Sequence, residues 1–520
     1  MSGSNPPKSQ PETVLRGNDR EDLSAILRVG EQFSGFEVVE TKRLDAFNIN
    51  AFFLKHHKSG ASYLHLDSAD TNNTFSIILR TPPKDSTGVA HILEHLVLCG
   101  SQKYPVRDPF FNMLKRSLNT FMNALTASDH TMYPFSTCHP RDFENLLSVY
   151  TDAVFFPKLR ETDFLQEGHR IQPSTDNPLG FENAGVVFNE MKGTLSDNAT
   201  LFMTRLQQRL LEGTTYGVVS GGDPPHIPEL SYEQLVEFHA TCYHPSSALF
   251  FSYGDLSPLS HMQQINDNCL DKFEYSEQSA SQHATKYNST KSSRQREFSE
   301  RCNPDSMQGD VSSQAKFAIS GLMHDSHDYV KSILMQMSSS LLISGPSAPL
   351  YQALIESGIA PTFAPGTGFD HSTRDTSFTV GVDGINVEDI GHIRTVIFDT
   401  LSKAVADPID RERVEGILHQ LELSFKHKTG NFGLGLMFGA ATSWAHSADI
   451  MASIDVDERL QALKSTPDEV RLCFLLLVSN LILIVLQLFV FLGCCLCRST
   501  QSVSETSWRR CKNTPRDQLS

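Results

Sequence analysis

The sequence predicts an α+β protein made of two related domains, each an antiparallel sheet with helices packed on one face, plus an apolar C-terminal helix. Three observations lead to this fold class. Short strand-like runs alternate with helical patterns early in the chain, a similar pattern returns after a polar stretch, and one long uncharged segment lies near the end. With 520 residues and 39% hydrophobic content, the chain can bury more than one core.

The polar and apolar stretches divide the chain into six expected segments. Serine, glutamine and asparagine enrichment marks the linker between the two domains. The expected boundaries are a polar arm at 1–30, a first domain at 31–270, a polar linker at 271–312, a second domain at 313–465, an apolar helix at 472–497 and a polar tail at 498–520.

The first domain begins with short β-like runs and continues with a helix over 88–98. Apolar residues recur in that helix every three to four positions, as one buried face requires, and Gly100 caps its end. A second helix, a hairpin and a third helix follow. The predicted ranges are strands 36–39, 48–53, 62–65 and 75–80, helices 108–118 and 141–155, and hairpin strands 120–127 and 130–137.

The helix over 88–98 carries the motif His-Ile-Leu-Glu-His. Its two histidines, His91 and His95, are four residues apart and therefore share one helical face, where both imidazoles can bind a single Zn²⁺. Glu94 is close enough to take a proton from a metal-bound water. This order of residues is typical of inverzincin metalloproteases.

A catalytic zinc site needs a third protein ligand from another element. Glu190 is favoured because Val186, Val187 and Met191 accompany it at helical spacing, which predicts a partly apolar helix. Glu167 and Glu182 are competing candidates, and we expect them to face solvent.

The second domain repeats the architecture without the metal motif. The segment 340–354 resembles 96–114, and the alignment places Gln336, Ser339 and Ser340 where the first unit has its histidines and glutamate. We therefore expect this domain to lack metal ligands. Its predicted elements are strands 316–320 and 376–382 and helices 330–342, 349–357, 387–405 and 411–426.

The uncharged run Leu472–Cys497 is longer than the roughly 20 residues that cross a bilayer as a helix. The basic residues after it would leave the tail on the cytoplasmic or matrix side. Two interpretations stay open: a transmembrane anchor, or an alternative terminus that does not belong to the folded enzyme.

Composition limits the partners and the compartment. The 44 basic and 60 acidic residues give a net charge of −16, which argues against nucleic-acid binding and favours cationic partners. The ten cysteines show no zinc-finger spacing, so we expect thiols of a reducing compartment, although a disulfide stays possible. The first 24 residues lack an apolar signal and mix acids with few arginines, so they predict neither secretion nor a transit peptide.

Several segments together resemble the pitrilysin/insulinase family of metalloproteases, in its presequence-degrading branch. They are GVAHILEHLVLCGSQKYPVRDPFF, QEGHR, GVVFNEMKG, VVSGGDP and HATCYHPSSALFFSYG, and the resemblance covers roughly residues 30–465. It implies that His91, His95 and Glu190 bind zinc and that Glu94 is the general base. It also implies an exposed strand edge at Asn123, Ala124 and Thr126, to which an extended substrate adds.

The same resemblance implies a zinc endopeptidase of the mitochondrial matrix that degrades unfolded peptides, such as cleaved targeting sequences, inside a closed chamber. Targeting peptides are arginine-rich, which suits an acidic enzyme. Family members are about twice as long, and no position here matches the arginine and tyrosine of their second half. An alternative is a weak or inactive half-enzyme that binds peptides while tethered to a membrane, and a structural subunit is a third possibility.

Overall fold

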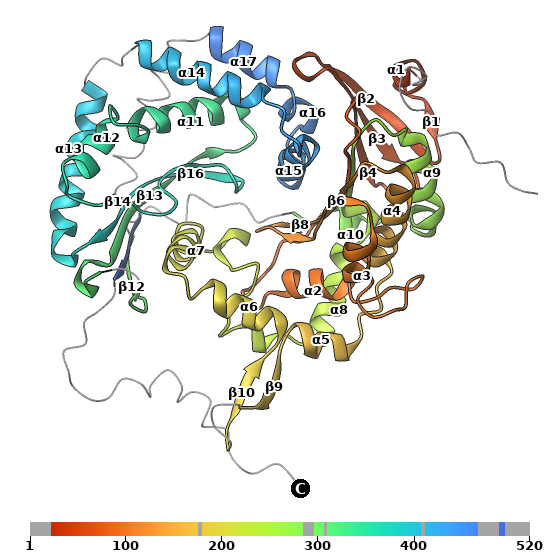
Figure 1. Ribbon diagram of the computed structural model, residues 1–520, viewed down its shortest axis with the longest axis horizontal. Coiled ribbons are helices and arrows are strands. Elements are labelled where there is room, and N and C mark those ends of the chain that lie inside the picture. Colours follow the sequence, from red (N-terminus) through yellow and green to blue (C-terminus); the bar gives the residue numbers. More distant parts are fainter. Residues whose placement is uncertain are drawn as a thin grey trace, which may run out of the picture.

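The computed structural model describes residues 22–174, 179–283, 296–305, 309–406, 411–465 and 488–493. Two sheets lie in the two halves of the chain, and helices cover their outer sides (Figure 1). The α+β class with antiparallel sheets is thereby confirmed, although two strand pairs, β4–β11 and β12–β17, are parallel.

Within the described residues, the first sheet has nine strands in the order β1-β2-β3-β4-β11-β5-β8-β6, with β7 also paired to β8. β11 (Ala248–Gly254) was not among the predicted strands, yet it lies between β4 and β5 in the centre of the sheet. All seven of its residues are buried, because a central strand is covered on both faces. The other strands are β1 (Gln32–Phe33), β2 (Phe36–Leu44), β3 (Ile49–His56), β4 (Ser62–Asp67), β5 (Asn73–Arg80), β6 (Asn119–Met122), β7 (Leu125–Thr126) and β8 (His130–Thr137).

One face of this sheet is covered by helices of the first half. Apolar residues of α2 and α4 pack there against alternate residues of the strands, such as Phe75, Ile77 and Leu79 of β5. Cys242 and Cys269 are buried thiols in the same core. The helices of this half are α1 (Leu23–Ile26), α2 (Val89–Val97), α3 (Pro109–Arg116), α4 (Pro140–Phe155), α5 (Glu161–Glu167), α6 (Val186–Thr194), α7 (Asn198–Leu210), α8 (Tyr232–Cys242), α9 (Pro258–Asn268) and α10 (Glu277–Ala280).

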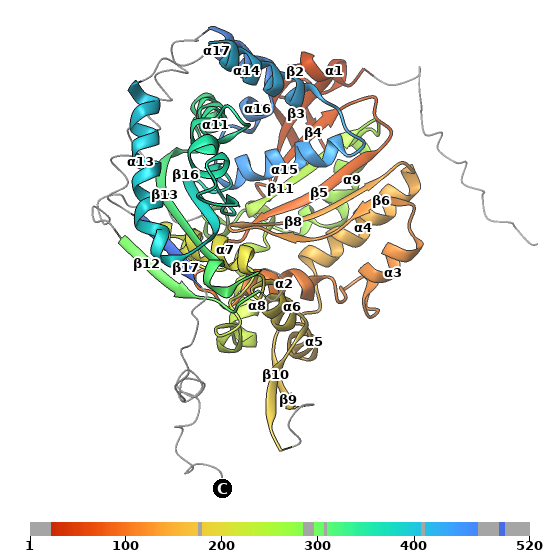
Figure 2. The same ribbon diagram turned by 60° about the vertical axis from the view of Figure 1, so that its left-hand side comes forward.

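The opposite face of the first sheet is covered by α15 (Phe432–Ala445), which comes from the second half of the chain (Figure 2). The intervening residues of the strands, such as Ile78 and Leu249, join Met437 and Ala441 in a core shared by both halves. The helices of the first half therefore cover one face of the first sheet, as predicted. The sequence did not indicate that α15 covers the other face.

The second sheet, within the described residues, has the order β12-β17-β13-β16-β14, with β15 paired to β16. Its strands are β12 (Arg296–Arg301), β13 (Ala315–Asp325), β14 (Thr362–Phe363), β15 (Gly368–Asp370), β16 (Asp375–Ile385) and β17 (Leu488–Gly493). Its helices are α11 (Tyr329–Ile343), α12 (Pro349–Tyr351), α13 (Ile390–Ala406), α14 (Arg411–Lys426), α16 (Ile450–Ser453) and α17 (Val456–Ser465), with a π-helical turn at Gln352–Glu356.

The predicted apolar helix over 472–497 is wrong for the part that the structure describes. Residues Leu488–Gly493 form β17, which pairs with β12 and β13. A run rich in leucine, valine and phenylalanine suits a strand as well as a helix, and hydropathy alone does not separate them. The rest of the run lies outside the described residues. Among the described residues, no helix has both the length and the apolar character needed to cross a bilayer.

Two segments that were predicted as a polar arm and a linker contain helices and a strand. The end of the polar arm forms α1, whose Leu23, together with Leu27, is buried in the first core. Part of the predicted linker forms α10 and β12, and β12 belongs to the second sheet.

A two-stranded hairpin, β9 (Arg170–Pro173) and β10 (Phe181–Ala184), projects from the body of the molecule in both views (Figures 1 and 2). It connects α5 to α6. Ile171 and Phe181 on this hairpin are largely exposed.

The contact between α15 and the first sheet gives a test at two glycines of one helix. A Cβ on Gly433 would lie 2.7 Å from Thr74 Oγ1 and would also clash with the Tyr253 ring, whereas Gly435 faces open space. We expect Gly433→Ala to destabilise the chain by about 1–3 kcal/mol. Gly435→Ala is expected to stabilise it by roughly 0.5–1 kcal/mol, because alanine loses less backbone entropy in a helix. Urea unfolding measures both, and equal shifts would contradict the close packing of α15.

Candidate metal centre

The N-terminus of α2 is fixed by a close approach of two backbone segments. Gly88 has φ +76°, and a Cβ there would lie 2.8 Å from Gly222 Cα. Only glycine allows this contact at low cost. The loop of Val219–Asp223 is bonded to Ser86, with Asp223 N donating to Ser86 O at 2.8 Å. The loop is thereby held beside the first histidine of α2.

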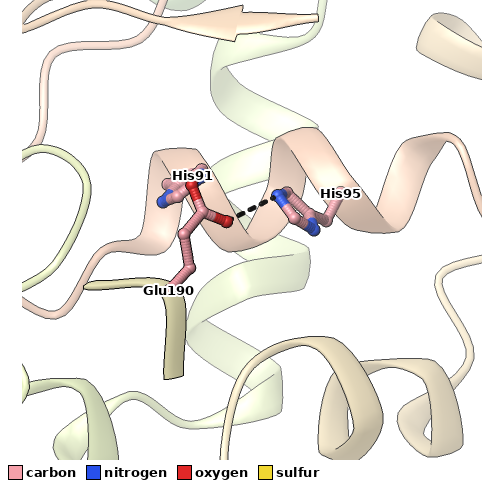
Figure 3. Close-up of side chains that lie close together, drawn as sticks. All are labelled: His91, His95 and Glu190. Carbon is pink, nitrogen blue, oxygen red and sulfur yellow. Dashed lines mark ion pairs between the residues drawn. The ribbon is translucent and has the colours of Figure 1, made fainter. Parts of the chain in front are cut away.

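The structure brings His91, His95 and Glu190 together (Figure 3). Glu190 Oε1 lies 3.6 Å from His91 Nε2, and Glu190 Oε2 lies 3.8 Å from His95 Nε2. Zinc bonds of about 2.0–2.2 Å in a tetrahedral shell separate neighbouring ligand atoms by about 3.4 Å. The two histidines and one carboxylate therefore lie close enough together to hold a single Zn²⁺.

The other ring nitrogen of each histidine is occupied by the protein. His91 Nδ1 lies 3.0 Å from Gly221 O, and His95 Nδ1 lies 3.2 Å from Glu167 Oε2. Both oxygens accept, so each Nδ1 donates its proton to the protein, and Nε2 is the ring nitrogen that faces Glu190. This arrangement, in which the second nitrogen of a ligating histidine is held by a carbonyl or carboxylate, is general for metal sites.

Glu167 differs from the sequence prediction, which expected it to face solvent. Its side chain is only 12% exposed, because α5 packs against α2 and directs the carboxylate to His95. Burial alone would lower the pKa of His95, but Glu167 and the nearby Glu94 and Glu190 raise it above its usual value. Glu182 lies on the projecting hairpin, where it accepts hydrogen bonds from Gln172 and Ser174.

Glu94 is buried beside His91 and His95 and does not belong to the group of side chains that could hold a metal ion. Burial raises the pKa of its carboxyl group, and the hydrogen bond from Thr126 opposes that rise. Thr126 Oγ1 donates to Glu94 Oε2 at 2.5 Å. Sequence reasoning did not find this bond, since it joins a helix to a strand 32 residues away.

The predicted substrate edge lies next to this carboxylate. Asn123 and Ala124 separate β6 from β7 at the side of β8 where the first sheet ends, and Asn123 is exposed. Asn123 N donates to Pro134 O, which keeps this segment aligned with β8. A pocket of about 390 Å³ lies here, and its lining includes Glu94, His95, Phe110, Phe111, Asn123, Ala124, Glu167 and Val186.

Two family models match the chain. "Insulinase (Peptidase family M16)" matches residues 80–177, and "Peptidase M16 inactive domain" matches residues 229–421. The mitochondrial presequence protease of Mus musculus is 46% identical over 85% of this chain and 43% of the relative. That of Schizosaccharomyces pombe is 40% identical over 89% of this chain and 46% of the relative. The chain thus spans less than half the length of these relatives.

Solved structures share the fold at low identity. A protease from Helicobacter pylori superposes with a TM-score of 0.64 at 15% identity, covering 87% of this chain and 99% of that one. A peptidase M16 inactive domain from Pseudomonas fluorescens gives a TM-score of 0.63 at 14% identity, covering 88% and 100%.

The contact between Glu167 and His95 predicts a change in metal affinity. Glu167→Gln removes the charge but keeps the shape, so we expect Zn²⁺ to bind about 10–100-fold more weakly. Glu182→Gln is the matched control, because its carboxylate lies on the hairpin away from the histidines. Competition with a fluorescent zinc chelator measures both dissociation constants. Equal affinities in the two variants would show that Glu167 does not support the metal ligand.

Proposed function

Because the chain belongs to the M16 family of peptidases, we propose that it is a zinc metalloendopeptidase that cleaves unfolded peptides. The observation that carries the proposal is the convergence of His91, His95 and Glu190 beside the buried Glu94, at a pocket bordered by a strand edge. These groups supply the ligands, the base and the substrate platform that peptide hydrolysis needs.

The protein's part in the reaction follows from these positions. When bound, zinc supplies Lewis acidity toward the scissile carbonyl and lowers the pKa of its water to about 7. Glu94 accepts a proton from the attacking water and passes it to the leaving amine. Thr126 holds the Glu94 carboxylate by one oxygen, so that the other oxygen is available for the proton.

An extended peptide is the substrate that this surface suits. Strands β6 and β7 pair only with β8 in the described part of the chain, which leaves a backbone edge near Glu94. A peptide can add to such an edge through main-chain hydrogen bonds. We propose that Asn123, Ala124 and Thr126 border its path, with Phe110 and Phe111 receiving an apolar side chain in the pocket.

Cationic presequence-like peptides are the proposed substrates. The net charge of −16 attracts basic chains, and the names of the relatives are those of mitochondrial presequence proteases. These names also support a mitochondrial location, and we propose the matrix as the compartment from the family resemblance. Membrane association through 472–497 finds no support in the strand formed by residues 488–493.

A second candidate function is a peptide-binding module with weak or absent turnover. It is favoured by the backbone edge of β6 and β7, which can hold a peptide whether or not cleavage follows. In that case the metal site and the strand edge would bind peptide with little or no hydrolysis.

Substitution of the base distinguishes the two functions. In a fluorogenic presequence-like peptide assay, Glu94→Gln is expected to lower kcat by about 10²–10⁴-fold, because proton transfer is lost while His91, His95 and Glu190 still bind zinc. Zinc content is measured on the same samples, and chelator removal followed by zinc addition serves as the control. Zinc-loaded wild-type protein that binds the peptide without cleaving it would leave the peptide-binding module as the function.

The charge of the substrate gives an independent test. We expect kcat/KM for an arginine-rich peptide to exceed that of the same peptide with glutamine at those positions. The difference should shrink several-fold as salt rises from about 50 to 300 mM, because salt screens the attraction. Equal values for both peptides at low salt would exclude a preference for cationic substrates.

A further inference from the structure

The turn at Ser128 and Asp129 connects β7 to β8 and follows closely after Thr126. Ala127 N donates to His130 O at 2.8 Å, so the loop between the strands has two residues. Favoured two-residue hairpin turns need a positive φ at one or both positions, and neither Ser128 nor Asp129 has one. This turn therefore needs support from outside the hairpin.

That support comes through the side chain of Asp129, which is 3% exposed. Its Oδ1 accepts a hydrogen bond from His130 Nδ1 at 2.7 Å, and its Oδ2 accepts one from the Tyr216 hydroxyl at 2.6 Å. His446 Nε2 lies 3.3 Å from the same Oδ2. Burial alone would raise the pKa of Asp129, but the two histidines hold it well below its usual value.

The partners of Asp129 come from separate parts of the chain. Tyr216 lies in the short helix Thr215–Gly217 that follows α7, and His446 caps the C-terminus of α15. His446 Nδ1 lies within hydrogen-bond distance of Ser326 Oγ, at 2.9 Å, and the other ring nitrogen, Nε2, faces Asp129 Oδ2 at 3.3 Å. Arg80 donates to Trp444 O at 2.7 Å and fixes the same end of α15. The second half of the chain thus reaches the β7–β8 turn through a buried contact.

The β7–β8 turn also fixes the position of Thr126. Thr126 pairs with Thr131 across the hairpin, and its hydroxyl holds the Glu94 carboxylate. We propose that Asp129 is a positioning residue for the general base, held by His446 and Tyr216 so that the turn presents Thr126 to Glu94. The second half then contributes to catalysis without any metal ligand of its own. The expected effect on kcat rests on the proposed function, whereas the structural link from Asp129 to Thr126 does not.

The kinetic test is a double-mutant cycle in the full chain. Asp129→Asn is expected to lower kcat by about 10–100-fold, with KM and zinc content nearly unchanged, because a base misplaced by about 1 Å loses that much. In a Thr126→Val background the same substitution should have little further effect. A full additional loss in that background would overturn the proposal, since Asp129 would then not act through Thr126. Tyr216→Phe removes one donor and gives a milder variant if Asp129→Asn fails to fold.

Asp383→Asn is the matched control. It breaks a partly buried ion pair with Lys316, at 2.6 Å, that joins β13 to β16 within the second sheet. We expect it to lower stability and to leave kcat unchanged. If Asp383→Asn lowers kcat as much as Asp129→Asn does, the loss in Asp129→Asn reflects general destabilisation of the chain, and the proposal is wrong.

Amide hydrogen exchange provides a readout that does not depend on turnover. Asp129→Asn and His446→Gln should increase exchange in residues 125–132, whereas Asp383→Asn should not. Unchanged exchange in this segment overturns the proposal even if the chain hydrolyses peptides. Increased exchange in a chain without hydrolysis supports the link from Asp129 to Thr126 and counts against the proposed function alone.

Discussion

The packing of α15 across the first sheet is the contact on which the rest of the molecule depends. It buries the strand residues that do not face α2 and α4, so that both faces of the sheet become interior. It requires Gly433 at the closest approach to Thr74 and Tyr253. The end of the same helix delivers His446 to Asp129. One helix therefore closes a shared core and reaches the hairpin next to Glu94, the proposed general base.

In the candidate metal centre, each histidine contacts the protein through one ring nitrogen and directs the other toward Glu190, where we propose that the ion binds. The rings are oriented by Gly221 and Glu167. Glu94 is oriented in a similar way by Thr126. Because these supporting groups come from a loop, a helix and a strand far apart in the sequence, the geometry of the site depends on the packing of the whole first domain.

The sequence predicted the elements whose signal is local. The helix over 88–98 and its motif, the helix that carries Glu190, and most strands of the first sheet follow from periodicity and spacing, with boundaries shifted by a few residues. Three features depend on tertiary contacts and were missed. Glu167 loses most of its exposure because α5 packs on α2. β11 pairs with β4 although more than 180 residues separate the two strands in the sequence. α15 covers the second face of the first sheet, for which periodicity indicated no partner. The apolar run near residue 490 was assigned to a helix because hydropathy does not distinguish a spanning helix from an apolar strand.

The projecting hairpin of β9 and β10 offers a place to label the protein away from the candidate metal centre. It separates Glu167 on α5 from Glu190 on α6, yet both carboxylates are placed by their helices and not by the hairpin itself. Ser174 N donates to Gly180 O, which extends the pairing of the two strands. Phe181 on β10 is 76% exposed, so a label attached there would leave the two carboxylates in place. The exposed face of these strands is thus a natural attachment point for a fluorophore or an affinity tag that reports on the protein without disturbing its chemistry.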